Sequence, residues 1–285
     1  MRTMTESTHT RANEVGHEQL RHADLPTIRE HIRAGRYRRH TAGIGAGRLQ
    51  ANLAIMPERY ALDFMRFCQR NPKPCPLVGV TDTGDPRMRT AGDVDIRVDV
   101  PSYNLYRDGQ LAGTVPDLVD IWQDDLVVFA LGCSFTFEAA LQAGGIRLPH
   151  IDHDETVPMY RTAIETVAAG PFGGGMVVSM RPVPAHQIDL ATSISRRFPH
   201  AHGAPVHVGA PEAIGIQDLH APDWGDAPRI QQGDVPVFWA CGVTPQNAIR
   251  AAGIPFFISH TPGAMLITDI DDQAEIPVLN RPESP

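Results

Sequence analysis

The sequence has little cysteine, no excess of basic charge and no hydrophobic run at its start. Its 285 residues contain four cysteines, and a chain this long buries enough core to fold without disulfide bonds. With 25 Lys and Arg against 33 Asp and Glu, the formal net charge is −8. Nucleic-acid-binding proteins instead gather positive charge on one face. The composition therefore argues against nucleic acid as a partner and predicts free thiols in a reducing compartment.

The two ends of the chain lack the features of targeting or membrane segments. The first residues are polar and have no apolar core for export or insertion. We therefore expect residues 1–22 and 273–285 to be tails, the first disordered, in a cytoplasmic protein without a membrane partner. The densest basic stretch, Arg33 to His40, is more typical of a solvated helix end than of an anion site.

No nucleotide or flavin motif is present. The Gly-rich segment 40–47 precedes an apolar run instead of leading from a strand into a helix, which argues against dinucleotide binding. The cofactor thus stays unknown, and a divalent metal stays open although no metal ligands are assigned. A homo-oligomer also stays open.

Local patterns predict alternating helices and strands. Asp24 and Gly35 bound a short helix, and the prolines of segment 71–76 end a helix that begins at Pro57. Asp108-Gly109 predicts a tight hairpin, beside an alternating segment at 95–100. Later strand-like runs alternate with helical ones, which favours some parallel pairing.

These patterns predict an α/β fold. We expect a mixed-sheet, layered main domain formed by residues 23–150 and 226–272. A smaller α/β domain is expected as an insertion at residues 151–225, because Pro- and Gly-rich stretches near 168–175 and 209–236 suggest boundaries.

Two segments of the sequence resemble each other around a cysteine. Segments 128–140 and 237–248 each run from an apolar stretch through a Gly/Cys pair into a plausible helix, and they contain Cys133 and Cys241. Each thiol is therefore expected where a strand ends and a helix begins, the usual ligand position in α/β sheets. Because the match is short, chance explains it better than internal symmetry.

Several ordered motifs carry a family resemblance. They are Asn71-Pro-Lys-Pro-Cys-Pro76, Gly132-Cys-Ser-Phe-Thr-Phe-Glu138, Val157-Pro-Met-Tyr-Arg161, Met176-Val-Val-Ser-Met-Arg-Pro182, His202-Gly-Ala-Pro-Val-His207, Pro211-Glu-Ala-Ile-Gly-Ile216, Val237-Phe-Trp-Ala-Cys-Gly-Val-Thr-Pro-Gln246 and Ser259-His-Thr-Pro-Gly-Ala-Met-Leu-Ile-Thr-Asp269. The chain resembles the "putative hydro-lyase" family over about residues 25–272. The resemblance implies two different α/β domains and a carbon–oxygen lyase activity, and a related D-glutamate cyclase dehydrates D-glutamate to 5-oxo-D-proline. It supplies no settled catalytic residues.

Charged motif residues are candidates for substrate binding and proton transfer. Glu138 follows two phenylalanines, so desolvation could raise its pKa and make it an acid; a first-turn Glu favoured by the helix dipole is the alternative. Arg161 and Arg181 could each hold a substrate carboxylate or form a structural ion pair. Tyr160, beside Arg161, is a further substrate-binding candidate.

Histidines and a helix start complete the candidate set. His202, His207 and His260 could each be a base or a metal ligand, or an ordinary hydrogen-bonding residue in a turn; Pro205 removes the helical spacing of a zinc pair. Thr244 is expected to cap a helix whose N–H groups at 246 and 247 could receive a carboxylate. Cys133 and Cys241 would be activated at helix N-termini, unless they fill the core.

Three functions fit these residues. The first is a lyase that removes water from a small amino or hydroxy carboxylic acid, with D-glutamate as the concrete case. The second is a two-cysteine amino-acid racemase or epimerase, and the third is a non-catalytic protein that binds organic acids. An enzyme requires that the candidate residues converge on one hollow.

Overall fold

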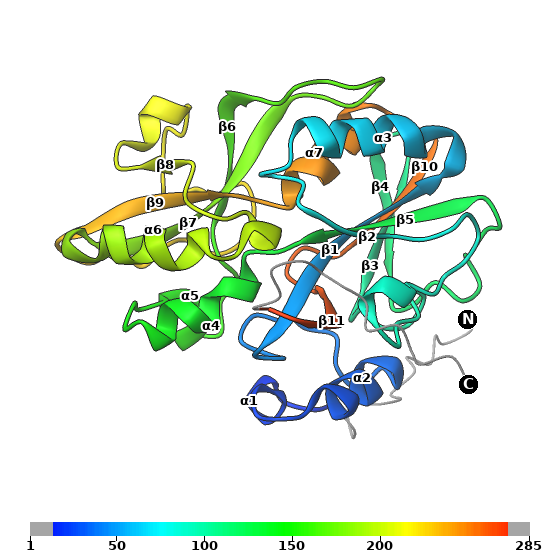
Figure 1. Cartoon of the computed structure of the whole chain (residues 1–285), viewed down its shortest axis with the longest axis horizontal. Helices are drawn as coiled ribbons and strands as arrows, with labels where there is room; N and C mark the ends of the chain where they lie inside the picture. The colour runs from blue at the N-terminus through cyan, green and yellow to red at the C-terminus, as the bar shows by residue number, and fades with distance from the viewer. Residues whose placement is uncertain (1–13, 273–285) are drawn as a thin grey trace, which may run out of the picture.

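The computed structural model describes residues 14–272 and contains two sheets that lie side by side (Figure 1). The first sheet has the order β2-β5-β1-β10-β3-β4, with β11 also paired to β1, and the second has the order β6-β7-β9-β8. The first sheet is formed by β1 (Arg48–Pro57), β2 (Leu77–Val80), β3 (Tyr103–Arg107), β4 (Gln110–Val115), β5 (Leu126–Gly132), β10 (Phe256–His260) and β11 (Leu266–Asp271). The second is formed by β6 (Met159–Glu165), β7 (Gly175–Pro184), β8 (His207–Val208) and β9 (Asp234–Ala240).

The helices surround the two sheets. They are α1 (His17–Arg21), α2 (Leu25–Arg33), α3 (Glu58–Arg70), α4 (Phe135–Ala143), α5 (Pro149–Asp152), α6 (Ile188–Arg196) and α7 (Val243–Ala251), with 3-10 turns η1 (Arg89–Ala91), η2 (Ala185–Gln187), η3 (Pro199–Ala201) and η4 (Pro211–Ile214). Asp24 caps α2 as predicted, because its Oδ1 accepts from the Thr27 N–H at 2.9 Å. Among residues 14–272, no helix combines the length and hydrophobicity needed to cross a membrane.

The α/β class with two sheets is confirmed, and so is the hairpin, in which Asp108 and Gly109 have φ values of 49° and 76° between β3 and β4. The expected parallel pairing is wrong, since every strand pair in the described part of the chain is antiparallel. The reason is that most helices do not link neighbouring strands of one sheet: β5 leads through α4 and α5 to β6, and β9 leads through α7 to β10.

Three local predictions also need correction. Residues 17–21, placed in the disordered tail, form α1, whose Leu20 is buried against α2 and Ile267. The alternating segment 95–100, expected to belong with the hairpin to an antiparallel part, forms turns and no strand; Asp99 accepts from the Asp95 N–H within them. Strand β9, assigned to the main domain, pairs with β7 in the second sheet. Whether the two sheets are separate domains stays a prediction.

The helices after β5 and β9 each pack against the sheet to which the preceding strand does not belong. Helix α4 follows a strand of the first sheet, yet its Phe137 and Leu141 pack with Trp239 of the second sheet. Helix α7 follows a strand of the second sheet, yet its Ile249 packs with Phe257 of the first. The two strand–helix connections therefore cross at the junction of the sheets and bring their turns together there.

The turns at this junction are too close for side chains larger than hydrogen. A Cβ on Gly132 would lie 1.5 Å from the His200 carbonyl oxygen, and one on Gly242 would lie 1.9 Å from Asn52 Nδ2. Neither glycine has a positive φ, so packing alone requires them. The tight approach fixes where β5 and β9 end.

Replacing Gly132 by Ala is expected to lower the free energy of unfolding by at least about 1–3 kcal/mol, because a backbone carbonyl must move. Urea denaturation would measure the change. Gly113→Ala is the matched control: no atom lies within 4 Å of its added Cβ, and we expect a change of no more than about 1 kcal/mol. Equal stability of the two variants would contradict the close approach at Gly132.

Candidate active site

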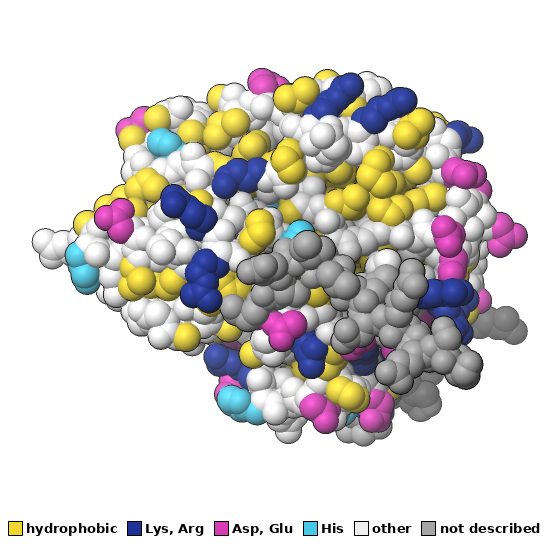
Figure 2. All heavy atoms as spheres, in the orientation of Figure 1, with side chains coloured by type: hydrophobic (Ala, Val, Ile, Leu, Met, Phe, Trp, Pro, Cys, Tyr) yellow, Lys and Arg dark blue, Asp and Glu magenta, His cyan; other side chains and the backbone are white. Residues whose placement is uncertain are grey.

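A small pocket lies at the junction of the two sheets. It encloses about 20 Å³, roughly the space of one water molecule. Its walls come from both sheets and from the loops before β6 and after β10: Asn52, Cys133, Ser134, Phe135, Thr156, Val157, Met159, Cys241, Val243, His260, Pro262, Gly263 and Met265. Surface charge gives no comparable signal, because the Lys and Arg side chains are spread over the face shown in Figure 2 without forming one basic surface there.

The two thiols face this pocket from equivalent positions. Cys133 directly follows β5 and Cys241 directly follows β9, and each is followed within two residues by a nine-residue helix, α4 or α7. The prediction that each thiol lies between a strand end and a helix start is confirmed.

The hydrogen bonds around the two thiols also match. The Cys133 N–H donates to the Gln50 carbonyl, and the Gln50 N–H donates to Thr136 Oγ1 at 3.0 Å. In the same way, the Cys241 N–H donates to the Val177 carbonyl, and the Val177 N–H donates to Thr244 Oγ1 at 2.9 Å. Each threonine is three residues beyond its cysteine. This agreement favours internal symmetry over the chance similarity that the sequence suggested.

Thr244 therefore has a different place from the one predicted. It is the second residue of α7, which has Gly242 at its N-cap and no side-chain cap. Its hydroxyl is occupied by the backbone of Val177. Thr244 positions the turn that carries Cys241 and does not offer its side chain to the pocket.

Burial opposes ionisation of both thiols. It raises the pKa of Cys133 to about 12 and that of Cys241 to about 11. Backbone N–H groups of Phe135, Val243 and Gly242 lower these pKa values but do not offset burial. Activation by helix N-termini, which the sequence left open against core filling, is thus outweighed by burial.

We expect the native protein to react slowly with thiol reagents near neutral pH, because the four cysteines are free and buried and thiolate is the reactive form. Mass spectrometry after brief iodoacetamide treatment would show unmodified chain, with four modified cysteines only after denaturation. Rapid modification of Cys133 or Cys241 in the folded protein would contradict the raised pKa values.

His260 lines the pocket as a neutral imidazole. Its Nδ1 accepts a hydrogen bond from the Leu53 N–H at 3.0 Å, so the proton of the neutral ring is on Nε2. The Gln246 amide nitrogen lies 3.1 Å from Nδ1 and 3.3 Å from Nε2. Burial lowers the pKa of His260 to about 4. These contacts favour a hydrogen-bond donor over the general base considered from sequence.

A buried ion pair lies directly behind the pocket wall. Arg181 Nη2 donates to Ser134 Oγ, which lines the pocket, at 3.0 Å and to Glu138 Oε1 at 2.5 Å. His150 Nε2 lies 2.8 Å from the same Glu138 oxygen. The guanidinium also stacks over Phe137 and Trp239. Arg181 therefore has the structural partner that sequence analysis left as one alternative.

The expected raised pKa of Glu138 is wrong. Desolvation does raise it, as the neighbouring phenylalanines suggested, but the charges and hydrogen bonds of His150 and Arg181 outweigh desolvation and lower the pKa below its ordinary value. A proton donor near neutral pH is thus not what this environment produces.

The other candidates lie away from the pocket. Arg161 has a half-exposed side chain that pairs with Asp223 at 2.8 Å and stacks on Trp224, and the Tyr160 hydroxyl donates to the Leu219 carbonyl at 2.6 Å. His207 Nε2 lies 2.7 Å from the Ala210 carbonyl oxygen. His202 is buried against the Lys73 carbonyl, and burial lowers its pKa to about 4.

Sequence analysis missed part of the pocket. Asn52, Ser134 and Thr156 line it, and Gln246 touches His260 from behind. Ser134 and Gln246 lie inside family motifs, so they could have been chosen. Asn52 could not, because it lies in a strand, β1, outside every family motif. Of the candidates expected to converge on one hollow, only Cys133, Cys241 and His260 line this pocket, and polar groups that carried no separate signal complete it.

The fold and the site define an α/β protein in which two equivalent thiol-bearing helix starts face one pocket. Residues 127–269 match the sequence profile described as D-glutamate cyclase. A "Putative hydro-lyase" of Dinoroseobacter shibae is 65% identical over 95% of this chain and 90% of its own length. One of Ruegeria pomeroyi is 60% identical over 93% of this chain and 97% of its own. The chain belongs to this D-glutamate cyclase and hydro-lyase family, which confirms the resemblance of the motifs.

Similarity to solved structures is weaker. A nitrogen repressor-like protein of Methanococcus jannaschii has a TM-score of 0.37 at 9% identity, covering 73% of this chain and 80% of its own. That similarity is too low to inform the fold or the site.

Proposed function

We propose that the chain is a lyase that removes water from a small carboxylic acid, with closure of D-glutamate to 5-oxo-D-proline as the concrete reaction. The observation that carries the proposal is the meeting of two helix N-termini, α4 and α7, at one pocket. Free N–H groups and the helix dipole favour an anion at such a position. Family membership supports the reaction class.

The substrate carboxylate would lie at the helix starts. The N–H groups of Phe135 and Val243 point to the thiols at the pocket, and they could serve a carboxylate oxygen as well. Arg161 and Arg181 are both engaged elsewhere. Backbone donors would therefore take the role that sequence analysis gave to these arginines as one of two alternatives.

Lactam closure involves no net gain or loss of protons, so the protein only has to transfer protons within the substrate. The α-ammonium of D-glutamate loses two protons, its nitrogen forms a bond to the γ-carboxyl carbon, and one γ-carboxyl oxygen leaves with both protons as water. The helix N–H groups and the Nε2–H of His260 would stabilise the negative oxygen of the tetrahedral intermediate. The Ser134 hydroxyl could pass a proton to the leaving oxygen.

The pocket must widen to admit such a substrate. Its 20 Å³ is far below the roughly 300–1,000 Å³ of typical ligand pockets. Because its walls belong to two different sheets, a small separation of the sheets would open it without breaking either. Closure over the substrate would then exclude water from the reacting carboxyl.

Incubation of the pure protein with D- and L-glutamate and other amino and hydroxy acids tests the proposal. We expect one substrate to lose eighteen mass units, as water does, at a rate proportional to protein concentration. An Asn52→Ala variant, altered at the pocket wall, should be slower, and Arg161→Met, altered away from it, should not. Saturable binding of a carboxylic acid without turnover would instead support a binding protein.

The paired thiols also support a second candidate, a two-cysteine racemase or epimerase. Thiols on opposite sides of a pocket can remove and return an α-proton on opposite faces of a substrate. The raised pKa values of Cys133 and Cys241 weigh against it, because one thiol must be ionised to act as the base. Incubation in D2O separates the two: a racemase incorporates deuterium at the α-carbon without loss of water.

A further inference from the structure

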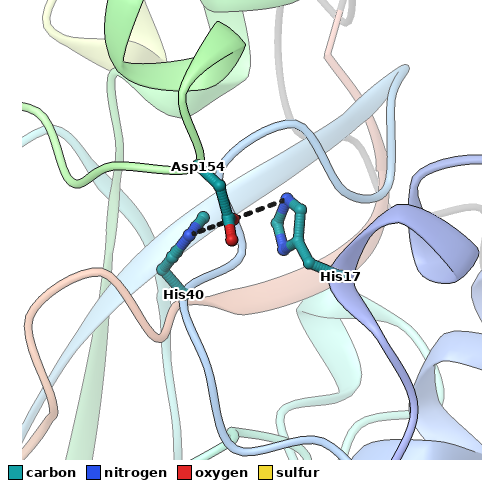
Figure 3. A group of neighbouring side chains, drawn as sticks. All are labelled: His17, His40 and Asp154. Carbon is teal, nitrogen blue, oxygen red and sulfur yellow. Dashed lines mark hydrogen bonds and ion pairs between the residues drawn. The ribbon is translucent and has the colours of Figure 1, made fainter.

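Three side chains from distant parts of the sequence meet beside α1. Figure 3 shows His17 of α1, His40 of the loop before β1 and Asp154 of the loop before β6 facing one another. One ligand atom from each lies within 4.8 Å of the others. His40 Nε2 lies 2.9 Å and His17 Nε2 lies 4.0 Å from the same oxygen, Asp154 Oδ1. Within residues 14–272, this is the one group of such side chains with metal-ligand spacing.

The proton positions on His17 follow from its second neighbour. The Tyr37 hydroxyl donates its hydrogen to the His40 carbonyl at 2.5 Å, so the Tyr37 oxygen accepts from His17 Nδ1 at 2.6 Å. The neutral ring then carries a lone pair on Nε2. That nitrogen faces a carboxylate oxygen, which cannot donate to it, although the His17 side chain is only 9% exposed. With this tautomer a lone pair and an anion face each other, an arrangement that a cation between them would stabilise.

Asp154 and His40 also direct ligand atoms towards the centre of the group. Arg39 donates to Asp154 Oδ2, which leaves Oδ1 turned to the two imidazoles. The His40 ring has no hydrogen-bond partner other than Asp154 in the described residues, since its Nδ1 is buried without one. In a metal complex the His40 proton would move to Nδ1 and Nε2 would coordinate. The hydrogen bonds between Tyr37 and His17 and between Arg39 and Asp154 are of the kind that orient metal ligands in proteins, whereas His40 Nδ1 has none in the described residues.

We propose that His17, His40 and Asp154 bind a divalent transition metal ion of the zinc type. Two imidazole nitrogens and one carboxylate oxygen form a ligand set that suits Zn²⁺ and Co²⁺, whereas Mg²⁺ and Ca²⁺ prefer sets made of oxygen. Ligand bonds of about 2.0–2.2 Å place tetrahedral ligand atoms roughly 3.4 Å apart. His17 Nε2 would therefore move in from 4.0 Å and His40 Nε2 out from 2.9 Å relative to Asp154 Oδ1. A fourth position is left for water or another ligand.

The site is joined to the rim of the candidate active pocket. A Cβ on Gly263 would lie 3.3 Å from His40 Cβ and 3.8 Å from Thr156 Cγ2, and both Gly263 and Thr156 line the pocket. The Thr41 N–H also donates to the Gly263 carbonyl. A bound ion would tie α1 and the loops before β1 and β6 together, and so would hold one wall of the pocket in place.

Titration of metal-stripped, full-length protein with Zn²⁺ and Co²⁺ tests the site. We expect one ion per chain by calorimetry, visible Co²⁺ absorption of a four-coordinate site and a raised Tm. His17→Gln and Asp154→Asn should abolish binding, and Tyr37→Phe, which removes the hydrogen bonds of the hydroxyl to His17 and to the His40 carbonyl, should weaken it by about 10–100-fold. His22→Gln at the C-cap of the same helix, with its exposed side chain, and His153→Gln beside Asp154 should bind as the unaltered chain does.

The outcomes separate this site from the proposed lyase. Metal binding that survives both His17→Gln and Asp154→Asn, or no binding by the unaltered chain at micromolar ion, would overturn the metal site, and the cluster would be a hydrogen-bonded anchor for α1. Circular dichroism of Asp154→Asn, whose site is at the surface, controls for folding. Because each readout is binding and not turnover, the metal site can fail while the lyase reaction stands, and the reverse.

Discussion

Replacing Glu138 by Gln is expected to lower the free energy of unfolding by about 3–5 kcal/mol. Glu138 and Arg181 have side chains 2% and 0% exposed, so the variant leaves a guanidinium buried without its counter-charge. The desolvation of an unpaired ion, and not the attraction of the pair, sets this cost. Urea denaturation followed by tryptophan fluorescence would measure it, since Trp239 lies against Arg181.

Two further variants define the origin of the effect. Arg161→Met breaks an ion pair whose side chains are 56% and 29% exposed, and we expect a loss of about 0–1 kcal/mol. The double variant Glu138→Leu with Arg181→Met removes both charges and should recover much of the loss of Glu138→Gln. If Glu138→Gln costs no more than Arg161→Met, the pair is not isolated from solvent as described.

The difference in stability between the unaltered chain and Glu138→Gln should depend on pH in one direction. The pKa of Glu138 in the folded protein is lowered from its ordinary value of 4.5, so the folded state favours the ionised carboxylate. Its contribution is therefore complete above the unfolded pKa and is lost as pH falls through the lower folded pKa. The stability gap between the unaltered chain and Glu138→Gln should be constant at neutral pH and narrow in acid below about pH 4.5.

Local sequence signals predicted elements well and their pairing poorly. Asp24, the prolines of segment 71–76 and Asp108-Gly109 act on neighbouring residues, so their helix and hairpin boundaries were correct. The direction of strand pairing depends on where a helix sends the chain next. Alternation of strands and helices suggested neighbours in one sheet, but α4 and α7 carry the chain into the other sheet.

The candidate site shows the same division. Cys133 and Cys241 could be found because each follows an apolar strand in a recognisable motif. The surroundings of Glu138 could not, because His150, one of the two groups that lower its pKa, stands in a segment without any motif. The metal ligands were beyond reach for a related reason: His17 and Asp154 are separated by about half of the chain, and neither lies in a motif with ligand spacing.

Substitution of Cys133 or Cys241 by Ser is expected to distinguish a racemase from a lyase, because the loss of turnover should be much larger for a racemase. A racemase uses each thiol to move the α-proton, so either variant should lower kcat by about 10²–10⁴-fold. A lyase that relies on helix N–H groups keeps those groups, and at least one variant should retain turnover within about tenfold. Water loss and deuterium uptake in D2O, followed by mass spectrometry, measure the two reactions in one sample.

Cys68→Ser, which buries a hydroxyl in the core of the first sheet, is the matched control for stability. Loss of dehydration in both variants, with folding intact, would mean that the thiols themselves take part and that the backbone donors do not suffice.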